Sequence, residues 1–271
     1  MSSISTPPRA VLVTGAAKRL GQALAVRLAS EGWDIALHYR SSSAEAQQTL
    51  QACQQARPQG RYFTLQAELA QASDLDRMWR ECLVRLPHVC AVVNNASVFE
   101  FDTAASASPQ SLALHWQTNL AAPVWLTQQL YAHLQAQGPA STGSTSGVVS
   151  SAKGVVVNLL DQKLFNLNPD FFSYTLAKSA LHTATTIMAQ ALAPTLRVVG
   201  VAPGLTLTSH MLSQEQFEKL HQLAPLGQSS TPDDIADAVL FALNQRAMTG
   251  TTLVVDGGQH LMPQARDFSV M

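Results

Sequence analysis

The segment Val11-Leu12-Val13-Thr14-Gly15-Ala16-Ala17-Lys18-Arg19-Leu20-Gly21 decides the fold of this chain. It reads as a short apolar strand, a glycine turn and the start of a helix. Gly15 allows a sharp turn, and Gly21 allows the helix to pack close to the strand or to a bound group. A turn of this kind presents a helix N-terminus on which a dinucleotide pyrophosphate can bind. An ordinary strand-to-helix loop is the alternative reading.

Strand and helix signals alternate along the rest of the chain without a break in composition. Strands are predicted at residues 10–14, 34–39, 62–66, 89–94, 155–160, 197–202 and 252–255, and several are continuous apolar runs, as in strands covered on both faces. Helices are predicted at 20–31, 44–57, 75–86, 109–120, 124–137, 173–192 and 233–243, two of them with a hydroxyl cap before proline, Ser108 and Thr231. This order predicts a single α/β domain over residues 9–271, a Rossmann-type doubly wound parallel sheet of about seven strands with helices on both faces. Residues 1–8 are expected to form a flexible tail.

Composition excludes several other classes of protein. The 271 residues are 46% hydrophobic and 13% charged, which suits one substantial core. A net charge of −1 gives no electrostatic footprint for nucleic acid or an anionic membrane. The three cysteines and eight histidines form no close-spaced ligand pattern, so no metal site is predicted. The sequence has no apolar run long enough to span a membrane and no signal core at its start, so a cytoplasmic location is expected.

A second motif carries chemistry. Tyr174 and Lys178 lie four residues apart in a helix-compatible stretch, so their side chains should share one helix face. A nearby positive charge is expected to lower the tyrosine pKa from its ordinary value of about 10, making the phenol a proton donor at neutral pH. A solvated surface pair is the alternative for this spacing alone.

With both motifs in place, the chain resembles the short-chain dehydrogenase/reductase family from about residue 10 to residue 258. Further stretches match the family pattern in order: Asn94-Asn95-Ala96 after the fourth strand, Asn119 in a helix, Pro203-Gly204 after the sixth strand and Asp256-Gly257-Gly258 after the seventh. The resemblance implies an oxidoreductase that binds a nicotinamide cofactor. It also implies that Tyr174 donates a proton, that Lys178 binds the nicotinamide ribose, and that Asn119 supports Lys178 through a water molecule.

One position departs from the family pattern. The family usually has a serine about thirteen residues before its tyrosine, and here that position holds Asp161. An aspartate can accept from ring N–H groups when ionised or deliver a proton when protonated, whereas a serine shares only a neutral hydrogen bond. Asp161 therefore favours an amino-substituted heterocycle over a simple ketone as substrate. The alternative is that Asp161 caps the strand end or pairs with Lys163.

The same substitution is typical of the pteridine reductases, and three stretches are similar to theirs: the glycine turn with Arg19, the strand end Leu37–Ser41, and the segment Asn94–Phe99. This resemblance implies that Phe99 sandwiches a pterin against the nicotinamide and that Ser97 lines the same pocket. For Phe99, a plain core aromatic is the alternative. The predicted substrate-binding residues are Ser97, Phe99, Asp161 and Tyr174.

The charges near the second strand favour NADP(H) over NAD(H). A site selective for NAD needs a carboxylate at the end of that strand, and the sequence offers Arg40 and Ser41 instead, with Lys18 or Arg19 from the glycine turn. A guanidinium can bind the 2′-phosphate with two hydrogen bonds. Motifs and resemblance together give a predicted cofactor set: Gly15, Lys18, Arg19, Leu20, Gly21, His38, Tyr39, Arg40, Ser41, Glu68, Leu69, Asn95, Ala96, Ser97, Tyr174, Lys178, Pro203, Gly204 and Leu205.

Three segments complete the predictions. Residues 138–153, rich in Ser, Thr and Gly, are expected to form a mobile loop. Residues 205–225 are expected to cover the substrate as a lid, with an ordinary surface helix as the alternative. The tail after residue 258 resembles tails that pack against a partner subunit, which implies a homotetramer.

The leading function from sequence is thus an NADPH-dependent reductase of a dihydropterin-like or dihydrofolate-like substrate. Two alternatives stay open: a reductase of a small carbonyl, acyl-thioester or quinone, and a non-catalytic NADPH-binding sensor or scaffold.

Overall fold

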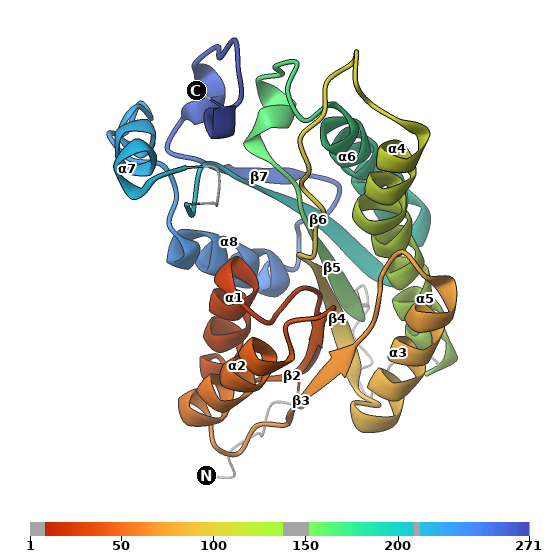
Figure 1. The fold of residues 1–271 in the computed structure, drawn as a ribbon. Coiled ribbons are helices and arrows are strands. Elements are labelled where there is room, and N and C mark those ends of the chain that lie inside the picture. The colour runs from red at the N-terminus through yellow and green to blue at the C-terminus, as the bar shows by residue number, and fades with distance from the viewer. Residues whose placement is uncertain (1–8, 138–151, 209–211, 271) are drawn as a thin grey trace.

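The computed structural model describes residues 9–137, 152–208 and 212–270. Its centre is one parallel sheet with the strand order β3-β2-β1-β4-β5-β6-β7 (Figure 1). The strands are β1 Arg9–Val13, β2 Trp33–Tyr39, β3 Tyr62–Gln66, β4 Val89–Asn94, β5 Gly154–Leu159, β6 Leu196–Pro203 and β7 Thr252–Val255. The order reverses between β1 and β4, and sheets of this type bind ligands at the carboxyl ends of the strands at that point.

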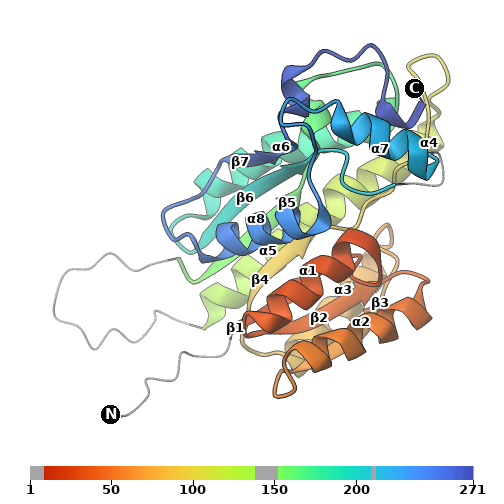
Figure 2. The same cartoon turned by 90° about the vertical axis from the view of Figure 1, so that its left-hand side faces the viewer.

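Helices cover both faces of the sheet. They are α1 Arg19–Ser30, α2 Ser43–Ala56, α3 Ala72–Arg85, α4 Pro109–Trp116, α5 Ala122–Ala136, α6 Phe172–Leu192, α7 Gln214–Gln222 and α8 Pro232–Asn244. Residues of α1, α2 and α8 pack on one face, and residues of α3, α5 and α6 pack on the other. Figure 2 shows α1, α2 and α8 in front of the sheet. The predicted doubly wound α/β fold is confirmed.

The two-sided covering follows from the sequence of the strands. In β1, Val11 and Val13 belong to the core on one face, whereas Ala10 and Leu12 belong to the core on the other, and all four are fully buried. Successive side chains of a strand point to opposite faces, so a strand buried on both sides must be apolar at every position. This explains why the strands were visible as continuous apolar runs.

Two predicted helix starts are confirmed in detail. The Ser108 hydroxyl accepts a hydrogen bond from the Ser111 N–H at 3.0 Å. Thr231 and Asp234 form a reciprocal capping box at the start of α8. Both caps satisfy backbone N–H groups that have no partner within the helix.

The separation between the predicted helices 109–120 and 124–137 was wrong. Here α4 runs through a π-helical segment, Gln117–Ala121, directly into α5. Pro123 does not interrupt the path because it lies in the first turn of α5, where a missing N–H is tolerated. The π segment contains Asn119, and such segments are frequent at functional sites. Residues 1–8 and 138–151, predicted to be a flexible tail and a mobile loop, lie outside the described residues.

Candidate active site

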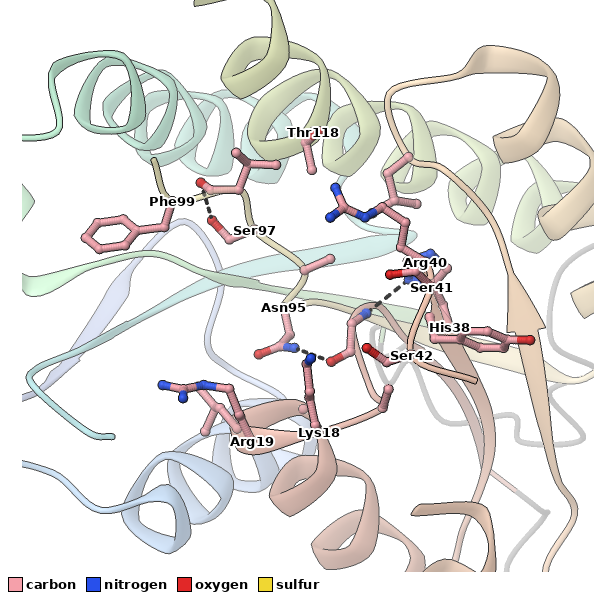
Figure 3. A pocket seen from close by; sticks show the side chains of 18 of the residues that line it. Lys18, Arg19, His38, Arg40, Ser41, Ser42, Asn95, Ser97, Phe99 and Thr118 are labelled. Atoms are coloured by element: carbon pink, nitrogen blue, oxygen red, sulfur yellow. Dashed lines mark hydrogen bonds between the residues drawn. The ribbon is translucent and has the colours of Figure 1, made fainter. Parts of the chain in front are cut away.

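A cavity of about 470 Å³ opens at the carboxyl ends of β1, β2 and β4 (Figure 3). Its lining includes these predicted cofactor residues: Gly15, Lys18, Arg19, Leu20, Gly21, His38, Tyr39, Arg40, Ser41, Glu68, Leu69, Asn95, Ala96 and Ser97. It also includes Phe99, predicted for the substrate, and residues that the sequence reasoning missed: Ala17, Ser42, Val98, Glu100 and Thr118. The structure thus brings together chain segments that the sequence places far apart.

The two glycines of the turn have the roles expected of them. Gly15 adopts φ +64°, a backbone conformation that favours glycine. A Cβ atom on Gly21 would lie 2.0 Å from the Gly15 carbonyl oxygen, so only glycine allows α1 to begin this close to β1. No side chain caps the N-terminus of α1 at Lys18. Its first N–H groups therefore face the cavity without an internal partner, an arrangement that fits a pyrophosphate.

His38 supports this turn from within the protein. The Gly15 N–H donates to its Nδ1 atom at 3.0 Å, which leaves the hydrogen on Nε2 for the Ala67 carbonyl at 3.1 Å. Burial lowers the pKa of His38 to about 4, so the imidazole is neutral at physiological pH. His38 lines the cavity, where its neutral ring accepts a hydrogen bond from the glycine turn and brings no charge to a nucleotide.

Asn95 fastens the end of β4 to the end of β1. Its Nδ2 atom donates to the carbonyls of Thr14 and Gly15 at 2.9 and 3.1 Å. In return, the Thr14 hydroxyl accepts from the N–H groups of Asn95 and Ala96, both at 3.0 Å. The two strand ends that flank the cavity are therefore held as one unit.

At the end of β2, the cavity presents Arg40, Ser41 and Ser42 (Figure 3). The only ion pair that the described residues give Arg40 is with Glu68 at 3.9 Å, and both side chains are partly exposed. Arg19 lines the cavity as well, and one N–H of its guanidinium donates to the Thr208 carbonyl at 2.6 Å. Both basic residues expected from the glycine turn, Lys18 and Arg19, therefore lie in the cavity together with Arg40.

Three of the four residues predicted to be catalytic, Asp161, Tyr174 and Lys178, meet between the carboxyl end of β5 and the first turns of α6. The Tyr174 hydroxyl donates to Asp161 Oδ2 at 2.7 Å. Lys178 Nζ lies 5.7 Å from the centre of the Tyr174 ring, so the two side chains share one face of α6 as predicted. Lys178 also donates to the Leu159 carbonyl at 2.6 Å. Tyr174 and Lys178 are buried, at 5% and 3% exposure.

The predicted lowering of the Tyr174 pKa is wrong for this structure. Burial raises the pKa of Tyr174 well above its usual value, and the nearby Asp161 carboxylate raises it further. Burial likewise raises the pKa of Asp161 and lowers that of Lys178 to about 8. The lysine charge does not dominate because the low-dielectric surroundings disfavour every ionised form and the closest charged neighbour of the phenol is an acid.

Asp161 caps the chain that follows β5, which is close to the alternative reading, and its predicted role toward a substrate stays a prediction. While Oδ2 accepts from Tyr174, Oδ1 accepts from the Lys163 N–H at 2.8 Å and caps the short 3₁₀ helix Gln162–Phe165. The carboxylate is therefore fixed by the backbone on one side and directed at the phenol on the other.

The Asn119 side chain is bonded to the segment that follows β4. Its amide donates to the Val98 carbonyl and accepts from the Val98 N–H, both at 2.8 Å. The Ser97 hydroxyl also reaches Asn119 Oδ1, at 3.3 Å. The side chain thus holds the segment that carries Ser97 and Phe99. The predicted water-mediated support of Lys178 stays a prediction.

Phe99 belongs to an aromatic cluster that the sequence did not reveal. Its ring stacks on Phe171 with centres 4.0 Å apart, and it meets Tyr174 edge-on at 4.7 Å. Phe171 is fully buried, whereas Phe99 remains 36% exposed. Phe171 therefore covers one face of the Phe99 ring, and the predicted stacking of a pterin on Phe99 stays a prediction.

The remaining predicted cofactor residues lie on α6 or at and after the end of β6, and they are not in the lining of this cavity: Tyr174, Lys178, Pro203, Gly204 and Leu205. The segment after β6 is held by Gln259, whose Oε1 accepts from the Leu205 N–H at 2.8 Å. A Cβ on Gly204 would approach that same oxygen to 2.5 Å, which explains the glycine.

The predicted lid, 205–225, contains the helix α7, which begins with a capping box at Ser213 and buries none of its residues. Residues 209–211 of this segment lie outside the described residues. The Arg19–Thr208 hydrogen bond ties the glycine turn to the segment that leads into α7. The C-terminal tail packs against the chain that follows β5 in the same molecule, through contacts described below.

No His, Cys, Asp and Glu side chains gather as a metal site among the described residues. None of the helices formed by those residues has the length and apolar character needed to cross a bilayer.

Comparison with known families identifies the family to which the chain belongs. The short chain dehydrogenase pattern matches residues 9–219. The chain belongs to this family. It is therefore an oxidoreductase with the family's nucleotide-binding fold, which agrees with the glycine turn and with the pair Tyr174 and Lys178.

Individual relatives span nearly the whole chain. Pteridine reductase 1 of Leishmania tarentolae is 31% identical, and the match covers 96% of this chain and 99% of the relative. The structure of FolM alternative dihydrofolate reductase 1 from Brucella canis, complexed with NADP, is 33% identical with a TM-score of 0.80, covering 93% and 94% of the two chains. The angucycline C-6 ketoreductase LanV with bound NADP is 26% identical with a TM-score of 0.80, covering 94% and 96%.

Proposed function

We propose that this chain is an NADPH-dependent reductase of a pteridine, either a dihydropterin or a dihydrofolate-like compound. The observation that carries the proposal is the direct hydrogen bond from the Tyr174 hydroxyl to Asp161 Oδ2, 2.7 Å long, beside the exposed ring of Phe99. A carboxylate at this position suits a substrate with ring N–H groups, and the ring of Phe99 suits a planar one.

The residues of the cavity fit NADP(H). The uncapped N-terminus of α1 accommodates the pyrophosphate, and the end of β2 presents Arg40, Ser41 and Ser42. Asp34, the acid within β2, lies near the start of the strand and is paired with Arg57, so it offers nothing to the ribose hydroxyls. The NADP complexes of FolM and LanV support the same cofactor for this chain.

In the proposed reaction, bound NADPH supplies the hydride, and the protein donates the proton and aligns the substrate with the nicotinamide. The raised pKa of Tyr174 keeps its phenol protonated at neutral pH, ready for the basic centre that forms on the substrate. In this structure the single hydroxyl hydrogen of Tyr174 points to Asp161 Oδ2, so it turns from Asp161 toward the substrate for the transfer. The tyrosinate that remains takes up a proton from solvent before the next turnover. Lys178 is held at the end of β5 by the Leu159 carbonyl, one helical turn from Tyr174.

A second candidate is the reduction of a ketone on an aromatic polyketide. The relatives favour it as well, since LanV is a ketoreductase and the promiscuous reductase LugOII, named for keto-reduction in lugdunomycin biosynthesis, is 28% identical with a TM-score of 0.81. An aromatic polyketide could also stack on Phe99. It does not require the carboxylate of Asp161, and this is why the pteridine is preferred.

The deciding experiment follows NADPH oxidation at 340 nm with purified protein against dihydrobiopterin, dihydrofolate, quinones, simple ketones and aromatic polyketide ketones. Turnover of the reduced pterins at least about tenfold above the other classes, a difference of about 1.4 kcal/mol in barrier, supports the proposal. Preference for a ketone supports the second candidate. Tight NADPH binding without turnover of any compound supports a sensor.

The assembly and the lid remain part of the proposal. The apolar side chains Leu112 and Trp116 on α4 and Leu176 and Ile187 on α6 are exposed, which supports the expected homotetramer. Light scattering coupled to size exclusion tests the assembly directly. The cytoplasmic location and the covering of the substrate by residues 205–225 stay predictions.

A further inference from the structure

Lys163 is a buried lysine that the proposed reaction does not use. Only 2% of the residue is exposed, although a solitary ammonium in such surroundings is strongly disfavoured. Its Nζ atom donates to the Asp170 carbonyl at 2.5 Å and to Asp267 Oδ2 at 3.0 Å. Each partner comes from a different part of the chain, so the ammonium joins them.

One of these partners belongs to the C-terminal tail, 104 residues away in the sequence. The tail is fastened to the same place by two more bonds: the Asp267 N–H and the Arg266 Nε both donate to Asp170 Oδ2 at 2.8 Å. Phe268, which follows, is 7% exposed. Figure 1 shows this last segment beside the chain that follows β5.

Lys163 is also linked to Asp161 and, through it, to Tyr174. The backbone N–H of Lys163 donates to Asp161 Oδ1, while Asp161 Oδ2 accepts from Tyr174. Fixing the Lys163 side chain therefore fixes the backbone that orients the Asp161 carboxylate. From Asp267 to the Tyr174 hydroxyl, the path runs through two side chains and one backbone amide.

We propose that Lys163 and Asp267 are positioning residues, a buried ion pair through which the C-terminal tail orients Asp161 and sets the electrostatic potential at Tyr174. This inference rests on the proposed role of Tyr174 as proton donor. It makes the tail a part of the active site within a single chain.

The two charges of the pair should act in opposite directions. Among the described residues, the charges that act on Asp161 or Tyr174 are those of Lys178 on α6 and Asp267 on the tail. The titratable ring of His115 on α4 lies 6.5 Å from that of Tyr174, and the Lys163 ammonium acts through its bond to Asp267. The negative charge of Asp267 raises the pKa values of both Asp161 and Tyr174. Neutralising Asp267 removes that effect and leaves the ammonium uncompensated, which lowers both pKa values. Neutralising Lys163 leaves the carboxylate uncompensated, which raises them.

The test compares pH profiles of kcat for the wild type, Asp267→Asn, Lys163→Met, the double variant and Arg266→Gln. Because the ionised Asp161 carboxylate accepts from Tyr174, activity falls below the pKa of Asp161, which the charge of Asp267 raises. We expect this acid limb to move down by about 1 pH unit in Asp267→Asn and up by a similar amount in Lys163→Met. We expect the double variant to return toward the wild-type profile. Arg266→Gln removes a bond of the same tail to Asp170 and should leave the limb in place.

Misalignment of Asp161 should also lower kcat in the two single variants, by up to about a hundredfold, while the KM for NADPH changes little. The proposal is overturned if the limb of the pH profile lies at the same pH in all variants, or if it shifts in the same direction in both single variants. If Lys163→Met does not fold, Asp267→Asn against Arg266→Gln decides by the same criterion.

Hydrogen exchange without substrate separates this inference from the proposed function. Asp267→Asn should increase exchange in residues 161–166 and 262–270, whereas Arg266→Gln should affect mainly the tail. Unchanged protection of residues 161–166 in Asp267→Asn contradicts the positioning role even if the wild type is an active pteridine reductase. Increased exchange there, with no turnover of any substrate by the wild type, supports the link while the proposed function fails.

Discussion

At the scale of single residues, the site depends on where one buried carboxylate directs its two oxygen atoms. Asp161 receives a backbone N–H on one oxygen and the Tyr174 hydroxyl on the other. Asp161 uses a separate oxygen for each bond, whereas a serine has a single oxygen and no charge. The departure from the family pattern therefore adds a second acceptor atom and a titratable group to the site.

Removing the Tyr174 hydroxyl tests its role as proton donor. In Tyr174→Phe, we expect kcat to fall by about 10²- to 10⁴-fold, because general acid catalysis contributes that much. The Kd for NADPH should stay within about twofold of the wild type, since the hydroxyl bonds Asp161 rather than the cavity that holds the nucleotide. Stopped-flow turnover and fluorescence titration of NADPH provide the two measurements. Near-normal turnover contradicts the assignment.

Cofactor choice rests on another single side chain. In Arg40→Ala, the Kd for NADPH should rise by about 10- to 100-fold, the loss of a hydrogen bond to a charged group, and the Kd for NADH should hardly change. Arg80→Ala is the matched control, because Arg80 is an exposed arginine whose described hydrogen bond is to Asp76 within its own helix. Equal weakening of NADPH and NADH in Arg40→Ala would show that the 2′-phosphate binds elsewhere.

At the scale of elements, the start of α6 is held by a residue of the loop after β4. Asp102 accepts from the Ser173 N–H at 2.9 Å and also from the hydroxyls of Ser173 and Ser111. The helix that carries Tyr174 is thereby capped by a carboxylate 71 residues earlier, at the positive end of the helix dipole. This contact ties the loop that carries Phe99 to the helix that carries the proton donor.

The same cap predicts a pH dependence of stability. Burial alone would raise the pKa of Asp102, but the hydrogen bonds from Ser173 and Ser111 outweigh it and the pKa is lowered. A lowered pKa in the folded state gives stability that is fully present above the unfolded value of about 3.9 and is lost as the pH falls through the folded value.

We therefore expect Asp102→Asn to lower the free energy of unfolding by about 1–2 kcal/mol at pH 7. The difference from the wild type should shrink as the pH falls below about 4. Urea unfolding at several pH values measures both effects. Ser108→Ala, which removes the neutral cap of α4, is the control and should give a difference that does not vary with pH. A pH-independent difference for Asp102→Asn would contradict the argument.

At the scale of the whole molecule, the features that could be predicted from the sequence are those that depend on residues close together in the chain. Each strand prediction lay within about one residue of its observed limits, because an apolar run between turns is a local signal. The glycine turn, Arg40 and the Tyr174 and Lys178 pair could be placed for the same reason. Contacts between distant segments could not: the stacking of Phe171 on Phe99, the bonds of Asn119 to Val98, and the tail reaching Lys163.

The pKa of Tyr174 is the clearest case of a property that could not be predicted from the sequence. The spacing to Lys178 was visible in the sequence, but burial was not, and burial decides the direction of the shift. The tail is a second case, since its resemblance to other tails implied packing against a partner subunit and did not show the contact that it makes within its own chain. Its docking site, the chain after β5, depends on a lysine whose burial no local pattern reveals.

Cofactor binding should stabilise the molecule as a whole, because the cavity joins the ends of β1, β2 and β4. A ligand that binds only the folded state at 100 times its Kd adds about 2.7 kcal/mol to the free energy of unfolding. For a chain of this size, that corresponds to a rise in Tm of about 5–10 °C. NADPH should produce this shift at concentrations where NADH produces a much smaller one. In Arg40→Ala, the two shifts should become similar, since only the interaction with the 2′-phosphate distinguishes the two nucleotides. Differential scanning calorimetry measures all four shifts, and equal stabilisation of the wild type by NADH and NADPH would contradict the assignment of the phosphate site to the end of β2.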